Sequence, residues 1–197
     1  MYQPLSAMAP FQVKDIMPRI QYQPDDIDKP EELVASVRSR RGGTLLNLDR
    51  MLLHSPAFTL GWNGFLKEVR SGLSIPAKLR ELVICYVAAL NEAEYEFHHH
   101  SPEFIKAGGT AAQLEAIRSF ESAGCEMDLF DLSEQAVLRL TLEMTRSVKV
   151  SDDTFAAAQT ALPGDQALVE MVGVIATYNM VSRFLVALGV QPEETEA

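Results

Sequence analysis

The sequence has little cysteine, and this limits the kinds of site and scaffold it can form. Its two cysteines, Cys85 and Cys125, form neither a Cys-x-x-Cys pair nor a zinc-binding spacing. Cys85 lies among apolar residues, which favours a buried and inert thiol, and nothing near Cys125 would activate it. We therefore expect no disulfide scaffold and predict a reduced, cytoplasmic protein.

Long apolar runs are also scarce. None reaches the roughly 20 residues that a membrane-spanning helix needs. The nearest, residues 169–190, is interrupted by Glu170, Asn179 and Arg183, so we interpret it as a buried helix. The first ten residues are mixed and broken by proline, unlike a secretory leader. These features predict a protein without a membrane partner.

Positive charge is in the minority. The formal net charge is −10 and the isoelectric point is near 4.8. Nucleic acid and anionic membranes would repel such a surface, so neither is an expected partner. Hydrophobic residues make up 47% of the 197 residues, which is enough for one domain with a sizeable core.

The pattern along the chain predicts an all-α, single-domain helical bundle. Valine, isoleucine and threonine do not cluster in alternating runs, so no strand is expected. Helix caps and breakers divide the chain clearly: Ser55-Pro56, Ser74-Ile75-Pro76, Asn91-x-x-Glu94 and Thr110-x-x-Gln113 predict helix starts, and glycines predict helix ends. Residues 1–30 contain recurrent prolines and predict an irregular N-terminal arm; residues 31–190 form the helical domain, and residues 191–197 an acidic tail.

The residues with most chemical potential lie in the middle of the chain. Three of the four histidines are consecutive, at 98–100, and Glu96 lies one helical turn before His100. Glu81 lies on the preceding helix, which can fold back against both. A carboxylate beside a histidine raises its pKa and fixes its tautomer, so the group can move protons near neutral pH. The alternative is a solvated helix face that carries ion pairs.

Other kinds of site are less well supported. Glu96-x-x-His99 matches half of a di-iron signature, but the remaining histidine, His54, has Met51 three residues before it, so the second half is missing. Adjacent histidines point in different directions around a helix, so we expect no metal and no cofactor. Ser101 lacks the glycines of a nucleophile elbow. Arg183 lies among apolar neighbours, where it is either satisfied within the fold or binds a substrate carboxylate.

Several segments together resemble a known family. Arg80-Glu-Leu-Val, Ala88-Ala-Leu-Asn, Tyr95-Glu-Phe-x-x-His100 and Ala107-Gly are similar to the core of the carboxymuconolactone decarboxylase and alkylhydroperoxidase D-like (AhpD-like) family. The resemblance covers roughly residues 40–190. It implies an all-helical fold and assembly into homo-oligomers, either trimers or hexamers, with active sites near subunit contacts.

Departures from the family pattern narrow the implied chemistry. The peroxidase branch has a Cys-x-x-Cys whose positions are Ala93 and Glu96 here. Without a thiol pair, alkylhydroperoxide or peroxiredoxin-type antioxidant activity is disfavoured. The Tyr-Glu-x-x-x-His form instead resembles the decarboxylase branch. It implies a lyase or isomerase step, such as decarboxylation, on a small unsaturated lactone or keto acid.

The resemblance also implies roles for individual residues. We predict His100 as the general acid/base, Glu96 as the group that orients it or carries a second proton, and Glu81 as the group that tunes both. Tyr95, His99 and Arg183 are predicted to bind the substrate. The alternative function is that of a non-catalytic binding or assembly member of the family.

Overall fold

The computed structural model describes residues 17–118 and 127–193, and every regular element in these ranges is helical. This confirms the all-α prediction. The elements are α1 (Glu31–Arg40), α2 (Asn47–Leu52), α3 (Pro56–Ser71), α4 (Ala77–Leu90), α5 (Glu94–Lys106), α6 (Ala111–Arg118), a short 3₁₀ turn at Met127–Leu129, α7 (Leu132–Ser147), α8 (Asp152–Ala161) and α9 (Asp165–Leu188).

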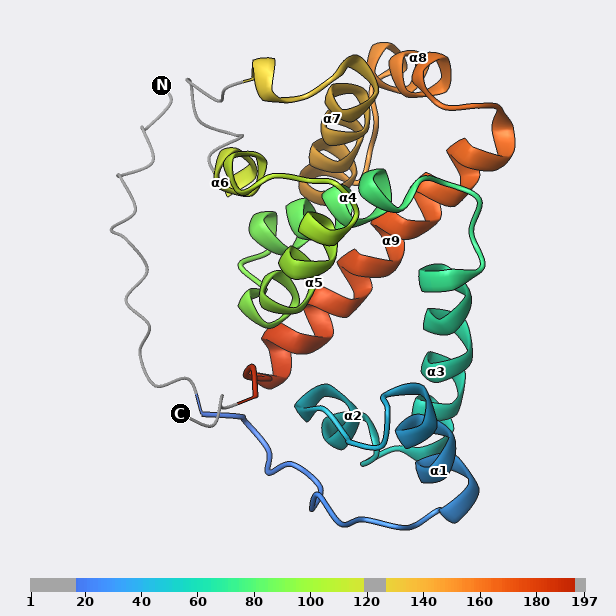
Figure 1. The fold of residues 1–197 in the computed structure, drawn as a ribbon, viewed down its shortest axis with the longest axis vertical. Coiled ribbons are helices and arrows are strands. Elements are labelled where there is room, and N and C mark those ends of the chain that lie inside the picture. Colours follow the sequence, from blue (N-terminus) through green and yellow to red (C-terminus); the bar gives the residue numbers. More distant parts are fainter. Residues whose placement is uncertain (1–16, 119–126, 194–197) are drawn as a thin grey trace.

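Two helices form the centre of the bundle. Residues Leu82–Val87 of α4 all have 0% exposure, because α5, α6, α7 and α9 cover this helix on every side. α9 crosses the molecule diagonally, and the smaller group α1–α3 lies beside its C-terminal half (Figure 1). By length and composition α9 is apolar enough to cross a membrane, but its residues Met171, Val174, Ile175 and Tyr178 are fully buried in the main core. It therefore acts as the core helix that the sequence predicts.

Several predicted caps are present in the structure. Thr110 and Gln113 form the predicted reciprocal bonds at the start of α6. A further cap, not among those predicted, is Ser151, which accepts from the amide of Thr154 at the start of α8. Gly189 ends α9 in the left-handed conformation with φ of 66°. For α6 we expect from its start a helix to about residue 123, and that end lies outside the described residues.

The predicted capping box at Asn91 is wrong. Asn91 is the C-cap of α4, and α5 begins only after Ala93, whose side chain forms no cap bond. The side-chain Nδ2 of Asn91 donates instead to Asn179 Oδ1 on α9, at 3.2 Å. Glu92 reverses the chain with a φ of 54°, so α5 returns antiparallel along α4. This tight reversal sets the relative positions of the candidate catalytic residues.

The described part of the N-terminal arm lies on its own chain. The Arg19 amide donates to the carbonyl of Leu188, and the Tyr22 hydroxyl accepts from the amide of Gln191, so the arm runs beside the end of α9. His54 contacts the backbone of Gln21 at 2.8 Å. Residues 1–16 of the predicted arm and 194–197 of the predicted tail lie outside the described residues.

Candidate active site

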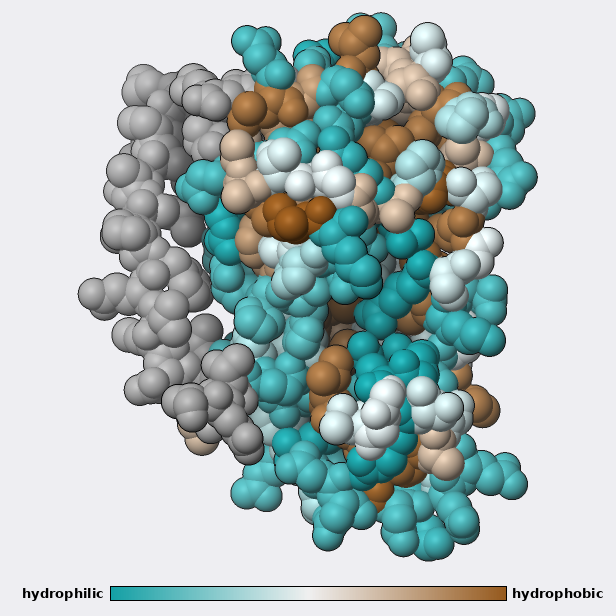
Figure 2. Space-filling view, in the orientation of Figure 1, coloured by the Kyte–Doolittle hydropathy of each residue, from teal (hydrophilic) through white to brown (hydrophobic). Residues whose placement is uncertain are grey.

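A cavity of about 360 Å³ lies where α4, α5 and α9 meet the α1–α3 segment. The molecular surface is hollowed near the centre of the face shown in Figure 2. Polar residues dominate the lining, which is unusual for a space next to a core. The lining residues are Arg41, Leu46, Leu48, Arg70, Arg80, Glu81, Tyr95, Glu96, His99, His100, Glu103, Val181 and Leu185.

Glu81 and His100 form a close pair in this cavity. Glu81 Oε2 lies 2.7 Å from His100 Nδ1, and Arg80 Nε donates to Glu81 Oε1 at 3.2 Å. The imidazole and the Tyr178 ring lie nearly perpendicular, at 88°, with the ring centroids 5.1 Å apart. Because a carboxylate only accepts, Nδ1 carries the proton, and a neutral imidazole then has its lone pair on Nε2.

The pKa values of the pair favour that state. Burial lowers the pKa of His100 below its ordinary value, and the hydrogen bond to Glu81 opposes this only in part. Burial raises the pKa of Glu81, but the His100 hydrogen bond and the Arg80 charge outweigh it and the pKa falls overall. Near neutral pH, the pair is therefore a carboxylate and a neutral imidazole, which is the form of a general base.

Glu96 occupies a different environment in the same cavity. Its side chain is buried, Oε2 lies 2.6 Å from Ser182 Oγ, and Oε1 has no hydrogen-bond partner among the described residues. Burial raises its pKa to about 8, although the Ser182 bond and the Arg70 charge act in the opposite direction. At neutral pH the protonated acid therefore predominates.

The hydrogen bonds of Ser182 agree with a protonated Glu96. Ser182 Oγ also lies 2.7 Å from the backbone carbonyl of Tyr178, one turn earlier in α9. A hydroxyl has a single proton, and a carbonyl can only accept. When Ser182 donates to the carbonyl, the Glu96 carboxyl group supplies the proton for the second bond. In that arrangement Oε1 can only accept a hydrogen bond, whereas it can carry the carboxyl proton when Ser182 donates to Oε2 instead.

The tail carboxylate Glu193 lies against the polar residues of α5. Its Oε1 accepts from the Tyr95 hydroxyl at 3.1 Å and from the Asn47 amide at 2.7 Å, and its Oε2 lies 2.8 Å from His99 Nε2. Burial raises the pKa of Glu193, but the contacts with His99 and the Asn47 amide outweigh it and lower the pKa to about 2. The tail therefore packs beside two residues that line the cavity, Tyr95 and His99.

The structure brings five of the six predicted site residues to one cavity: Glu81, Tyr95, Glu96, His99 and His100. Glu96 and His100 share a helix face as predicted, but it is Glu81 that bonds the imidazole.

Arg183 is the exception, because it does not line this cavity. It is exposed, and its guanidinium donates to the carbonyl and Oδ1 of Asn179 at 2.8 and 2.6 Å. Its neighbour Ser182 faces the site, and the 100° step of the helix turns Arg183 outward.

Sequence reasoning missed three arginines of the cavity, Arg41, Arg70 and Arg80. Arg80 has a local signal, since it precedes Glu81. Arg41 and Arg70 have none, because they lie on elements far from the histidines in sequence and reach the site only through the fold.

The described cysteine is unsuited to redox chemistry. Cys85 has 0% exposure, and burial together with the Glu81 charge raises its thiol pKa to about 12. Cys125 lies outside the described residues. No group of three or more metal-ligating side chains occurs among the residues that the structure describes.

Comparison with known proteins agrees with this architecture. Residues 56–131, which include α4 and α5, match the model of the carboxymuconolactone decarboxylase family. Among curated proteins, none matches the chain. Solved structures match over most of its length.

An uncharacterized peroxidase-related protein from Silicibacter sp. TM1040 has a TM-score of 0.73 and 16% identity, over 89% of this chain and 92% of that one. The debrominase Bmp8, in complex with 2,3,4-tribromopyrrole, has a TM-score of 0.69 and 18% identity, over 88% of this chain and 92% of that one. A peroxidase-related protein from Ralstonia eutropha JMP134, described as an alkylhydroperoxidase AhpD core, has a TM-score of 0.69 and 16% identity over 90% and 93%. Residues 56–131 are thus similar to the carboxymuconolactone decarboxylase family, and the chain as a whole has the fold of the AhpD-like, peroxidase-related structures.

Proposed function

We propose that the protein is an enzyme that uses cofactor-free acid/base chemistry on a small unsaturated lactone or keto acid. The reaction is a decarboxylation or a related lyase or isomerase step. One observation carries the proposal: a single cavity holds an imidazole paired with a carboxylate and a separate, buried carboxyl group with a pKa of about 8. Two groups of opposite protonation state are the requirement for concerted acid/base catalysis.

In this proposal His100 Nε2 moves a proton to or from the carbon next to a carbonyl group. Glu81 holds the Nδ1 tautomer and stabilises the imidazolium that forms when Nε2 takes a proton. When Ser182 donates its proton to Glu96 Oε2, the carboxyl proton of Glu96 lies on Oε1, from which it is supplied to the carbonyl oxygen where negative charge develops. Each proton-transfer group contributes about 10²–10⁴-fold to the rate.

The same groups account for a decarboxylation. When the carbon–carbon bond to the carboxylate breaks, CO₂ leaves. The electron pair of that bond moves into the conjugated carbonyl, whose oxygen takes a proton from Glu96. His100 then transfers the enol proton to carbon, and solvent restores the proton of Glu96. The net reaction consumes one proton and releases one CO₂, without an oxidant or a metal ion.

The comparisons support an enzymatic role at a coarser level. Bmp8 is a debrominase whose structure contains a small ring compound, and other relatives are described as peroxidase-related. A thiol peroxidase is not the function we propose, because the Cys85 thiol is buried and its pKa is about 12.

A hydrogen-exchange assay tests the proposal without knowledge of the product. Unsaturated lactones and keto acids are incubated with the protein in D₂O, and proton NMR follows both deuterium entry beside the carbonyl and loss of substrate. We expect exchange or turnover that His100→Gln and Glu96→Gln each reduce by about 10²-fold or more. The matched control is His98→Gln, because His98 is an exposed neighbour outside the cavity lining.

Activity that survives both substitutions would contradict the proposal. Substitutions that change only stability or assembly would favour the alternative, a non-catalytic binding or assembly protein.

We also propose self-association into a trimer or hexamer. Phe58, Leu60 and Phe65 are 46%, 67% and 51% exposed on α3, which is an unusual set for the surface of an isolated chain. Sedimentation equilibrium measures the assembly, and a monomer at micromolar concentration would contradict it.

A further inference from the structure

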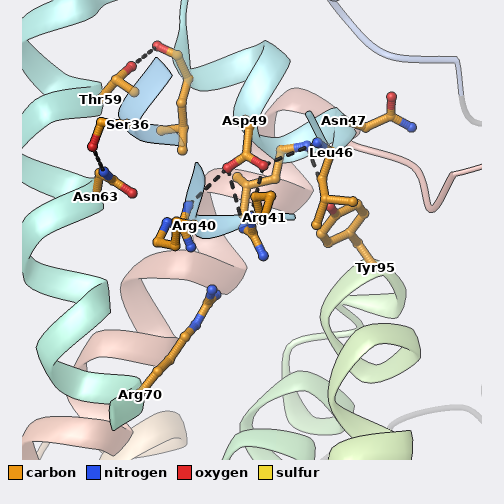
Figure 3. Close-up of polar contacts among 12 residues, drawn as sticks. Ser36, Arg40, Arg41, Leu46, Asn47, Asp49, Thr59, Asn63, Arg70 and Tyr95 are labelled. Atoms are coloured by element: carbon orange, nitrogen blue, oxygen red, sulfur yellow. Dashed lines mark hydrogen bonds and ion pairs between the residues drawn. The ribbon is translucent and has the colours of Figure 1, made fainter. Parts of the chain in front are cut away.

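Three arginines converge beside a single carboxylate at one end of the cavity. Arg40 Nη2 lies 3.2 Å from Asp49 Oδ1, and Arg41 Nε lies 2.9 Å from Asp49 Oδ2. Asp49 is 1% exposed and also accepts from the Leu46 amide at 3.1 Å. Arg70 approaches from α3, and in Figure 3 its side chain extends toward Arg40 and Arg41 without a bond to either. Asp49 thus forms ion pairs with two guanidinium groups, and the third, Arg70, interacts with it only at longer range.

Arg70 has no carboxylate partner among the described residues. Its Nε donates to the Tyr178 hydroxyl at 3.2 Å, which is a neutral hydrogen-bond partner and not an ion pair. Glu96 is close enough to interact with Arg70 electrostatically, but its raised pKa keeps it mostly neutral at pH 7. The Asp49 and Glu96 charges favour the Arg70 cation from a distance, but no carboxylate among the described residues forms an ion pair with its guanidinium group.

The other described carboxylates that line the cavity already have partners. Glu81 bonds Arg80 and His100, and Glu103 forms an exposed ion pair with Lys106. Glu193, beside the cavity, is held by Tyr95 and His99. None of these groups neutralises Arg70.

The cluster contains more positive than negative charge, since three guanidinium groups lie near one carboxylate. The chain as a whole carries a net charge of −10, so clustered cations at one cavity wall run against its composition. Arg40 Nε is buried without a hydrogen-bond partner, and burial together with the Arg41 charge lowers the Arg40 pKa to about 10. Buried cations are normally paired, because desolvation without a counter-charge is unfavourable.

We infer that Arg70 and Arg41 form an anion-binding subsite that holds a carboxylate group of the substrate. A guanidinium group presents parallel N–H donors that match a carboxylate in geometry and charge. Both arginines line the cavity that contains His100 and Glu96. Tyr178 connects the two ends of the site, since its hydroxyl bonds Arg70 and its ring contacts His100. A carboxylate on Arg70 thus leaves the rest of a small molecule beside the acid/base groups.

The subsite deepens the proposed function, and rests on it only for the claim that the bound anion is the substrate. Binding is measured without turnover, so the anion subsite and the proposed function can be refuted separately. The probes are crotonate, a small unsaturated carboxylate, and crotonamide, its neutral analogue of the same shape. Ligand-observed NMR titrations at pH 7 and constant ionic strength give their affinities for the native protein.

We expect crotonate to bind about 10-fold or more tightly than crotonamide, since hydrogen bonds to charged groups are the stronger kind. Arg70→Met keeps much of the apolar stem and removes the charge. It is expected to abolish the preference for crotonate and to leave crotonamide affinity unchanged, which also shows that the cavity is intact. Arg139→Met is the matched control, because Arg139 is exposed on α7 and remote from the lining residues.

Two results would overturn the inference: equal affinities of the native protein for crotonate and crotonamide, or a preference for crotonate that survives in Arg70→Met. The first needs no variant, so it stands even where Arg70→Met fails to fold. His100→Gln is expected to retain the preference. Retention there together with absent turnover in the native protein would refute the proposed chemistry and leave the anion subsite in place.

Discussion

Replacement of Glu96 by glutamine tests whether the buried carboxyl group is protonated at neutral pH. The pKa of Glu96 is about 8 in the folded protein, against an ordinary value of 4.5. A group whose pKa is raised by folding stabilises the folded state fully below its unfolded pKa, and this contribution is lost as pH rises. Glu96 is therefore expected to make the native protein less stable as pH increases from about 4.5 to about 8.

The size of the effect follows from the two pKa values. At about 1.4 kcal/mol for each pH unit, the interval from 4.5 to about 8 corresponds to about 5 kcal/mol as an order of magnitude. The side chain is only 2% exposed, so solvent screening reduces it little. Glutamine is uncharged at every pH, and its amide can donate to Ser182 Oγ as the protonated acid does.

Urea denaturation of both proteins at intervals between pH 5 and 8.5 measures this difference. We expect Glu96→Gln to have a stability close to that of the native protein at the acid end. Its advantage then grows by up to about 1.4 kcal/mol per pH unit. Glu103→Gln, which removes an exposed carboxylate from the same helix, controls for the change in net charge. A stability difference that stays constant with pH would refute the protonated state of Glu96 and its role as an acid.

Further substitutions test other parts of the site and fold. Glu81→Gln removes the carboxylate that raises the pKa of His100, so we expect the acidic limb of the kcat/KM profile to move to lower pH and the maximal rate to fall; an unmoved limb would exclude His100 as the base. The Cys85 thiol is buried and has a pKa of about 12, so we expect it to resist iodoacetamide at pH 7.5 in the native protein and to react in urea. Mass spectrometry measures the labelling, and rapid labelling of the native protein would contradict this burial. In Gly109→Ala the added Cβ would lie 2.3 Å from the buried ring of Phe104. We therefore expect urea denaturation to show a loss of about 1–3 kcal/mol in the free energy of unfolding. An unchanged free energy would contradict the close packing of Gly109 on this ring.

Local sequence signals determined much of the fold. The Thr110 and Gln113 capping pair and the left-handed Gly189 are set by residues within a few positions of each helix end, so their pattern predicted α6 and the end of α9. The same is true of Glu96 and His100, whose one-turn separation places both side chains on one face of α5. The Asn91 prediction failed because the amide has a tertiary partner, Asn179, that no local pattern reveals.

The electrostatic states of the site were decided only by the tertiary structure. The sequence placed Glu81, Glu96 and His100 near one another, but it could not say which carboxylate bonds the imidazole. That depends on the antiparallel return of α5 along α4, which brings Glu81 to 2.7 Å from His100, while α9 supplies Ser182 to Glu96. The same applies to the arginine of the cavity. The sequence suggested Arg183, but the fold brings Arg70 to the lining instead. Spacing along one helix fixes which side chains share a face, whereas burial and charge pairing depend on residues that folding brings from distant parts of the chain.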